Sequence, residues 1–333
     1  MRTPLPVGTH LTLSAIGTQQ QITVQIQELI GTGASCLVYT AVCRDGEQNE
    51  FYLRLKEFCP ENLHLIRRQD GSLLAADEEA FQRQMQSFIW GYQKQMQFRQ
   101  FPESCNSISN VQGVFAGNGT RYIAMNCQNS IPLEQQELSL YDTFRVLRAV
   151  AQQLDNLHQH GYLYLDLKPA NVLLYPETPE LVMLFDFDSA VEKSRLSDAV
   201  ISCTAKWAAP EVLQQNRRKI GVVSDVYTLG GLLLYLLFRR APEVKDRRNR
   251  AVWDTEFPDS VLAGTAPEIR RMVTELLRKT LAANPEKRYA SCAELLAQIE
   301  PFLDSFQQPK PYLQTKLPLG NNYFCGRDIE LQE

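Results

Sequence analysis

The chain has 333 residues, of which 44% are apolar and 22% are charged, and its formal net charge is −4. This composition is typical of a folded globular protein, and the acidic balance argues against a general nucleic-acid-binding protein. The eight cysteines form no Cys-x-x-Cys pair, so they predict neither a zinc site nor a disulfide framework, and reduced thiols in a cytoplasm fit them best. The longest apolar run, residues 229–238, is too short to span a bilayer, so no membrane insertion is expected.

The first part of the chain carries mainly strand signals. Alternating and β-branched runs predict three strands, and a later strand pair is predicted around Asn118-Gly119, a strong hairpin signal. Between them, apolar residues at helical spacing predict one long helix. In chain order, the predicted segments are strands at 22–26, 37–42 and 51–55, the helix at 76–100, and strands at 109–115 and 121–126.

Beyond Pro132 the pattern becomes helical. Apolar stripes predict helices at 140–157, 224–238, 267–281 and 291–303, and a proline-containing segment with the composition of a linker follows. The predicted divisions are an N-terminal extension (1–21), a β-rich region with one long helix (22–128), a larger helical region (129–305), and a proline-containing linker with the start of a further domain (306–333).

A loop between a predicted helix and a predicted strand carries the residues with the clearest chemistry. Residues 164–171 (YLDLKPAN) contain a carboxylate at Asp166, an ammonium at Lys168 and an amide at Asn171. The carboxylate can take a proton from a hydroxyl group, the ammonium can stabilise a transferred phosphate, and the amide oxygen can bind Mg²⁺. Together they predict phosphoryl transfer, which depends on positioning and charge more than on covalent chemistry.

From about residue 22 to residue 305 the sequence resembles the eukaryotic-type serine/threonine protein kinase family. The motifs that carry the resemblance follow the family's order: residues 164–171 (YLDLKPAN), 184–188 (LFDFD), 203–211 (CTAKWAAPE), 224–230 (SDVYTLG) and 284–288 (NPEKR). The resemblance implies an α+β, two-lobed protein kinase fold, with a small β-rich N-lobe and a larger helical C-lobe.

Several roles in the C-lobe are implied by this resemblance. Asp186 would be a second ligand of Mg²⁺, and Asp225 would hold the backbone of the catalytic loop. Arg288 would form an ion pair with Glu211 near the end of the activation segment. Lys168, together with Thr204, resembles the Ser/Thr branch of the family rather than the Tyr branch.

In the first lobe, residues 30–38 (IGTGASCLV) resemble the glycine-rich loop of the family, and the strand that follows argues against a dinucleotide-binding fold. Lys56 would contact the α- and β-phosphates of ATP. Met125 would lie behind the adenine, and residues 126–128 would form the hinge. The implied ATP-binding residues are Ile30, Gly31, Gly33, Val38, Lys56, Met125, Asn126, Gln128 and Leu173, while Asn171 and Asp186 would hold Mg²⁺.

Two departures from the family lie in the first lobe. Arg54 is two residues before Lys56 and on the same side of the strand, where the family has a small apolar residue against adenine. The long helix carries acids only near its start, and alignment on the family pattern puts Lys94 where the family has the glutamate that pairs with the lysine. Glu78 and Asp186 are the candidate partners of Lys56.

Two further departures lie around the catalytic residues. Leu165 replaces the arginine before the catalytic aspartate, so we expect activity without phosphorylation of the activation loop. Asp188 replaces the glycine after Asp186-Phe187, so the backbone there is expected to switch less freely between active and inactive conformations.

Two functional hypotheses follow. The first is an ATP- and Mg²⁺-dependent kinase that phosphorylates Ser or Thr of a protein substrate. The alternative is a pseudokinase acting as a nucleotide-sensing or scaffold module, motivated by Arg54 and Lys94. A small-molecule kinase is disfavoured because residues 203–211 and Arg288 resemble the peptide-binding half of protein kinases.

The tail raises a separate hypothesis. Residues 322–331 (NYFCGRDIEL) resemble the Gly-Arg-x-x-Glu-Leu segment that precedes P-loop NTPase modules in multidomain signalling proteins. The sequence therefore suggests a downstream NTPase-type domain in a longer protein, and an ordinary polar tail is the alternative.

Overall fold

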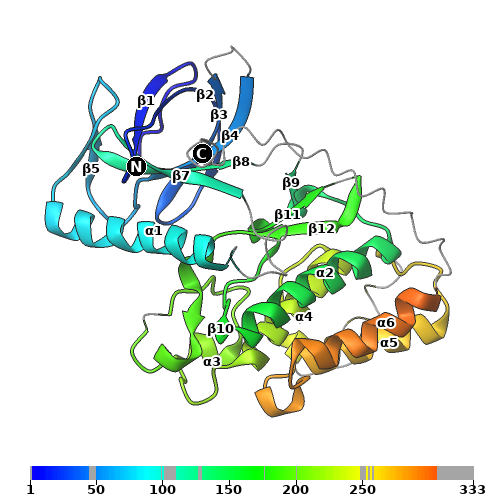
Figure 1. Cartoon of the computed structure of the whole chain (residues 1–333). Helices are drawn as coiled ribbons and strands as arrows, with labels where there is room; N and C mark the ends of the chain where they lie inside the picture. The colour runs from blue at the N-terminus through cyan, green and yellow to red at the C-terminus, as the bar shows by residue number, and fades with distance from the viewer. Residues whose placement is uncertain are drawn as a thin grey trace, which may run out of the picture.

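A computed structural model of the chain describes residues 2–44, 50–98, 100, 110–126, 130–175, 177–199, 201–247, 253, 256 and 259–305. A β-barrel with one helix beneath it forms one lobe, and a bundle of helices forms the other (Figure 1). This is the α+β, two-lobed fold that the sequence predicted.

Six antiparallel strands close into the barrel of the N-lobe, in the order β1-β2-β3-β4-β8-β7. Side chains alternate between the interior and the solvent, as on β2, where Val24 and Ile26 are buried and their neighbours are not. Asn118 and Gly119 both have positive φ, which fits the tight hairpin predicted there. The strands are β1 (His10–Ala15), β2 (Gln21–Thr32), β3 (Cys36–Arg44), β4 (Glu50–Phe58), β7 (Asn110–Gly117) and β8 (Thr120–Asn126).

The predicted start of this lobe at residue 22 is too late. β1 pairs with β2 and, through Ser14 and Ala15, with β7, so the predicted N-terminal extension belongs to the barrel. Leu11 and Leu13 of β1 are buried in its core. Their alternation with polar residues is a strand signal that the sequence analysis missed.

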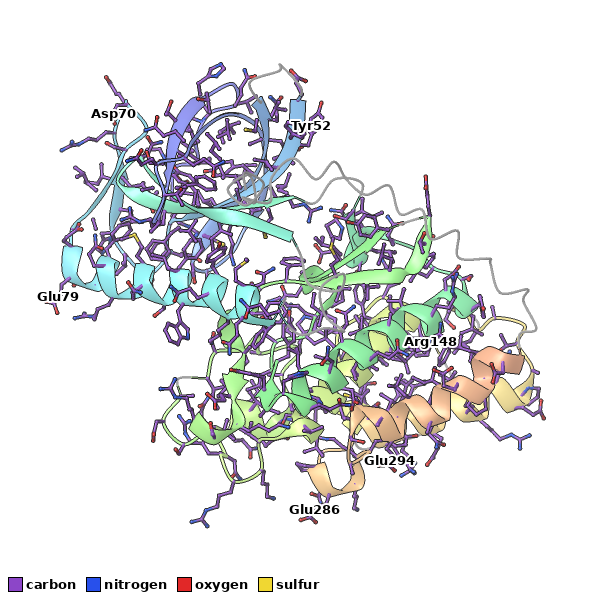
Figure 2. All side chains as sticks on the ribbon, viewed as in Figure 1. Tyr52, Asp70, Glu79, Arg148, Glu286 and Glu294 are labelled. Atoms are coloured by element: carbon purple, nitrogen blue, oxygen red, sulfur yellow. The ribbon has the colours of Figure 1, made fainter. Side chains whose placement is uncertain are left out.

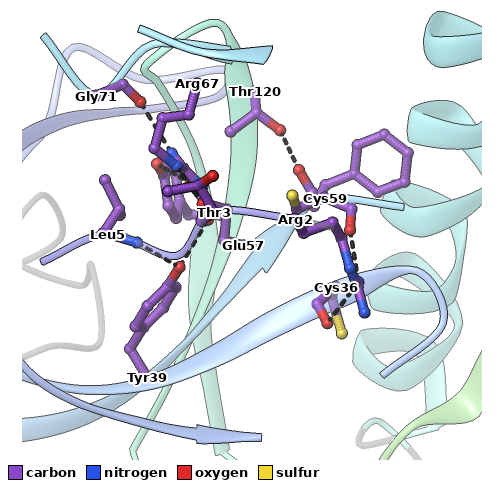
Figure 3. A network of polar contacts seen from close by, with 12 residues as sticks. Arg2, Thr3, Leu5, Cys36, Tyr39, Glu57, Cys59, Arg67, Gly71 and Thr120 are labelled. Carbon is purple, nitrogen blue, oxygen red and sulfur yellow. Dashed lines mark hydrogen bonds and ion pairs between the residues drawn. The ribbon is translucent and has the colours of Figure 1, made fainter. Parts of the chain in front are cut away.

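A short hairpin that the sequence did not predict, β5 (Leu65–Arg67) and β6 (Leu73–Ala75), lies between β4 and the long helix. It places Arg67 against the buried carboxylate of Glu57, with nitrogen–oxygen distances of 3.1 and 2.7 Å (Figure 3). The hydroxyls of Tyr39 and Tyr122 donate to the same carboxylate at 3.0 and 2.7 Å. Every charge in this network is therefore paired or hydrogen-bonded, as burial requires.

The predicted long helix is α1 (Glu78–Phe98). Asp77 caps its first turn by accepting a hydrogen bond from the amide of Ala80. Its apolar stripe packs on the sheet, since the rings of Phe81 and Phe88 lie 5.1 and 5.3 Å from that of Phe58.

The predicted helices of the C-lobe are α2 (Leu140–Gln159), α4 (Val222–Phe238), α5 (Pro267–Thr280) and α6 (Cys292–Ser305). The short α3 (Pro210–Leu213) was not predicted. Most residues of α4 are buried, which explains its apolar sequence. No helix in the described part of the chain combines the length and hydropathy needed to cross a membrane.

Short strands at the junction of the lobes position the loops with chemistry. They are β9 (Ile131–Pro132), β10 (Tyr162–Leu163), β11 (Val172–Tyr175), β12 (Thr178–Leu184) and β13 (Val191–Glu192). β11 begins directly after Asn171 and β12 ends two residues before Asp186. Because β11 and β12 are antiparallel neighbours, these two side chains come from adjacent strand ends.

Candidate active site

The catalytic loop lies between β10 and β11 and holds Asp166 in a fixed orientation. One carboxylate oxygen accepts from Lys168 Nζ at 2.7 Å, and the other accepts from the Thr204 amide at 2.7 Å. Lys168 also donates to the Thr204 hydroxyl at 2.7 Å. Asp166, Lys168 and Thr204 therefore form a closed set of contacts, which joins the loop to the activation segment.

The backbone of this loop is held from beneath by Asp225 of α4. Its buried carboxylate accepts from the amides of Tyr164 and Leu165 at 2.9 and 2.7 Å, and His158 Nε2 lies 2.8 Å away. Leu165 has a φ of 65°, a strained value for a residue with a side chain, so the Asp225 contacts help to fix it. This is the position that the resemblance implied for Asp225. His158 has a structural contact there.

Asn171 contacts Asp166, and Asp186 follows the neighbouring strand β12 by two residues. The Asn171 amide nitrogen donates to the backbone oxygen of Asp166 at 2.9 Å and to its carboxylate at 3.2 Å. Carboxylate and amide oxygens suit Mg²⁺, which proteins often hold with one or two carboxylates plus phosphate oxygens. Among the described residues no group of three or more His, Cys, Asp or Glu side chains could hold a metal ion. A site completed by phosphates fits this donor set.

Lys56 of β4 reaches across to the C-lobe. Its Nζ lies 2.9 Å from Asp186 Oδ1 and 3.8 Å from Asp188 Oδ2. Burial alone would lower the pKa of Lys56, but these two carboxylates hold that pKa well above its usual range. Burial and the neighbouring Asp186 carboxylate in turn raise the pKa of Asp188 to about 6.

The structure distinguishes between the two candidate partners of Lys56, Asp186 and Glu78. Asp186 is one of them, whereas Glu78 is exposed at the start of α1 and accepts a hydrogen bond from Gln82. The Glu78 hypothesis is wrong, because Lys56 is paired elsewhere. Glu79, the other acid of α1, also lies at the outer end of the helix (Figure 2). Lys94 donates to the carbonyl of Ala190 at 2.6 Å.

The glycine-rich loop connects β2 and β3. Ile30 and Gly31 lie near the end of β2, and the Gly33 amide donates to the carbonyl of Cys36 at 2.9 Å, which closes the turn. Arg2, which the sequence did not single out, donates to the carbonyl of Gly33 at 2.7 Å. It also donates to the carbonyls of Cys36 and Cys59 at 3.3 and 2.7 Å (Figure 3). A lone arginine near the start of a chain carries no sequence signal for such a contact.

The residues predicted to surround adenine are partly brought together. Val38, Met125 and Leu173 belong to one apolar cluster at the junction of the lobes. Asn126 is the last residue of β8, and Gln128 lies outside the described residues. Arg54 pairs in register with Met125 and donates to the carbonyl of Ser130 at 3.2 Å.

The end of the activation segment is anchored by a buried ion pair. Arg288 donates to both carboxylate oxygens of Glu211, at 2.6 and 2.9 Å. The Ser224 hydroxyl donates to the same carboxylate at 2.7 Å. The predicted pair of Arg288 and Glu211 is therefore present, and it ties α3 to the loop before α6.

Comparison with known families gives a match over residues 93–299 to the family described as the protein kinase domain. The chain belongs to the protein kinase family. The matched part of this kinase contains Asp166, Asn171 and Asp186 but begins after Lys56 and the glycine-rich loop. Of the two unusual residues of the N-lobe, Arg54 lies before the matched range and Lys94 lies just inside it.

Curated relatives agree with this assignment. The kinase is 30% identical to the serine/threonine-protein kinase PknB of Mycolicibacterium smegmatis over 162 residues, 46% of this chain and 25% of that protein. It is 30% identical to the probable serine/threonine-protein kinase SCO3848 of Streptomyces coelicolor over 167 residues, 49% of this chain and 24% of that protein. It is 27% identical to the smooth muscle myosin light chain kinase of Gallus gallus over 156 residues, 44% of this chain and 8% of that protein. The chain therefore matches a quarter or less of the length of these relatives.

Proposed function

We propose that the chain is an ATP- and Mg²⁺-dependent protein kinase that transfers the γ-phosphate of ATP to a Ser or Thr hydroxyl of a protein. The observation that carries this proposal is the closed set of contacts among Asp166, Lys168 and Thr204, with Asn171 bound to Asp166 and with Asp186 just after the adjacent strand. The serine/threonine-protein kinases among its relatives support the same activity.

The proposed roles follow from the geometry of the chain's own residues. Asp166 orients the acceptor hydroxyl and takes its proton as the hydroxyl oxygen bonds to the γ-phosphorus and the bond to the β-phosphate oxygen breaks. Lys168 places its ammonium beside the transferred group, where negative charge must be stabilised. Lys56 orients the α- and β-phosphates. Mg²⁺ held by Asn171 and Asp186 would neutralise charge on the phosphate oxygens.

The scaffold alternative loses much of its motivation. It was motivated by Arg54 and by the missing helix glutamate, yet Lys56 lies within 4 Å of two other carboxylates. Asp166, Lys168 and Asn171 contact one another in one loop, and Asp186 pairs with Lys56 just after the adjacent strand. This arrangement of residues supports an active kinase better than it supports a pseudokinase that only binds nucleotide or protein partners.

The proposal can be tested with the purified chain, [γ-³²P]ATP and Mg²⁺, with autophosphorylation and a generic substrate such as casein as readouts. We expect incorporation into Ser or Thr by the wild type, and a loss of at least about a hundredfold in Asp166→Ala, since a general base typically contributes that much. Matching melting temperatures would show that the variant is folded. A wild type that binds ATP but incorporates no phosphate would contradict the proposal.

Two further parts of the proposal concern the chain's surroundings. A cytoplasmic location is supported by the free thiols of Cys36, Cys59, Cys203 and Cys292, and fractionation of cells that express a tagged protein tests it. A downstream NTPase-type domain is supported only by residues 322–331, which lie outside the described residues. Sequencing the gene beyond the codon for Glu333 tests it directly.

A further inference from the structure

The helix α1 does not supply the acidic partner that Lys56 needs. Its acids, Glu78 and Glu79, lie in its exposed first turn. Lys94, at the position where the family has its glutamate, donates to the backbone of the segment after Asp186 instead. Asp186 contacts Lys56, but the proposed function also assigns Asp186 to Mg²⁺. A second anion is therefore needed if Lys56 is to stay in place while Asp186 binds metal.

Asp188 is the second carboxylate beside Lys56. Its Oδ2 lies 3.8 Å from Lys56 Nζ. Its other oxygen lies against Gly91 of α1, where an added Cβ would come within 1.8 Å of Asp188 Oδ1 and 2.9 Å of its Cγ. Any side chain at position 91 would thus collide with this carboxylate.

Two unusual residues are explained by this one contact. Glycine in the interior of a helix is unfavourable, so Gly91 requires a reason in packing. An aspartate directly after Asp186-Phe187 is equally unexpected in this family. The Asp188 carboxylate on the loop occupies the space that a side chain at position 91 of the helix would fill.

The surrounding contacts fix the direction of the Asp188 side chain. Lys94 Nζ donates to the carbonyls of Asp188 and Ala190 at 3.4 and 2.6 Å, which holds the backbone on both sides. The ring of Phe187 packs between those of Phe98 and Tyr164, with centroids 5.1 and 5.2 Å away. The residue before Asp188 is thus anchored in the core.

We propose that Asp188 is a positioning residue that replaces the family's helix glutamate, holding Lys56 over the phosphates of ATP from the activation-segment side. This inference rests on the proposed kinase activity. In this chain the anion that holds the lysine would then lie on the segment that also carries Asp186, whereas the family has it on the helix that corresponds to α1. Binding of nucleotide by Lys56 then depends on Asp188 and on the space that Gly91 leaves for it.

Moving the carboxylate from position 188 on the loop to position 91 on the helix tests this role. Asp188→Gly installs the family's residue and removes the anion, and we expect kcat/KM for ATP to fall at least about tenfold, mainly through KM, because a partly buried cation loses a partner. Adding Gly91→Asp to Asp188→Gly returns a carboxylate to the same space from the helix side and should recover most of the loss. The matched control, Gly91→Ala with Asp188→Gly, adds a Cβ at position 91 without a charge and should recover none of the lost kcat/KM.

The dissociation constant of a fluorescent ATP analogue, measured for the same variants with melting temperatures as a folding check, gives a readout that does not need turnover. An unchanged KM and dissociation constant in Asp188→Gly would overturn the inference. Equal recovery by the Asp and Ala double variants would also overturn it, because space rather than charge would then matter. If the wild type transfers no phosphate, the proposed function fails, whereas the dissociation constants still decide the role of Asp188.

Discussion

Arg54 is a cation on the same face of β4 as Lys56. In the structure its guanidinium donates to the backbone oxygen of Ser130 at 3.2 Å. The resemblance to protein kinases implies that adenine packs against this position. An incoming nucleotide therefore has to displace the guanidinium from Ser130 or to pack against it.

We expect Arg54→Ala to lower KM for ATP by about two- to tenfold, which corresponds to one ordinary hydrogen bond that no longer has to be broken. Steady-state kinetics at varied ATP concentration measures this. A rise in KM would show instead that the guanidinium contacts the bound nucleotide, and a melting curve would show whether the variant remains folded.

At the residue scale, the sequence predicts chemistry well where the residues are neighbours in the chain. Asp166, Lys168 and Asn171 lie within six positions, and one loop brings them together. The partners of Lys56 are harder to predict, since Asp186 is 130 positions away. The contact of Gly91 with Asp188 could not be predicted, because it depends on how α1 packs on a distant loop.

At the scale of elements, the buried ion pair of Glu57 and Arg67 ties the β5–β6 hairpin to β4. The side chain of Glu57 is fully buried and that of Arg67 is 4% exposed. Removing one member leaves a charge without its partner in a dry environment, which is much more costly than losing a surface ion pair.

We therefore expect Arg67→Ala to lower the free energy of unfolding by about 3 kcal/mol or more. Denaturant unfolding monitored by fluorescence measures the change. Arg68→Ala is the matched control. Arg68 is the next residue in the chain and its side chain is exposed, so its loss should change the free energy of unfolding by less than about 0.5 kcal/mol. Equal losses in the two variants would contradict the importance of the buried pair.

The elements themselves divide into those with a strong sequence signal and those without one. The long helices and the Asn118-Gly119 hairpin were predicted correctly, because apolar periodicity and turn residues are local properties. The strands β5 and β6 have three residues each, and Ile66 and Leu74 are exposed, so neither has a periodic pattern. Their position is set by Arg67 and Glu57, which only the folded chain brings together.

At the scale of the whole molecule, the activation segment is joined to the C-lobe by contacts that need no phosphate. Thr204 donates to Asp166 at one point, and Glu211 pairs with Arg288 at another. Leu165, which stands where many kinases have a phosphate-binding arginine, is buried in the apolar core. The segment therefore has its anchors in the unmodified chain.

We expect the triple variant Ser194→Ala, Ser197→Ala and Ser202→Ala to keep its activity within about twofold, since surface substitutions rarely disturb a fold. Initial rates on casein measure this, and phosphatase-treated wild type provides a control without mutation. Loss of activity in both samples would show that a phosphate in this segment is required.

The closed barrel of the N-lobe limits how other chains can bind to it. An open sheet ends in a strand with unpaired amide and carbonyl groups, to which a second polypeptide can add a strand of its own. Here β1 pairs with both β2 and β7, so the barrel formed by the described strands offers no such edge. A regulator or a second copy that docks on the barrel must therefore recognise its side chains and turns.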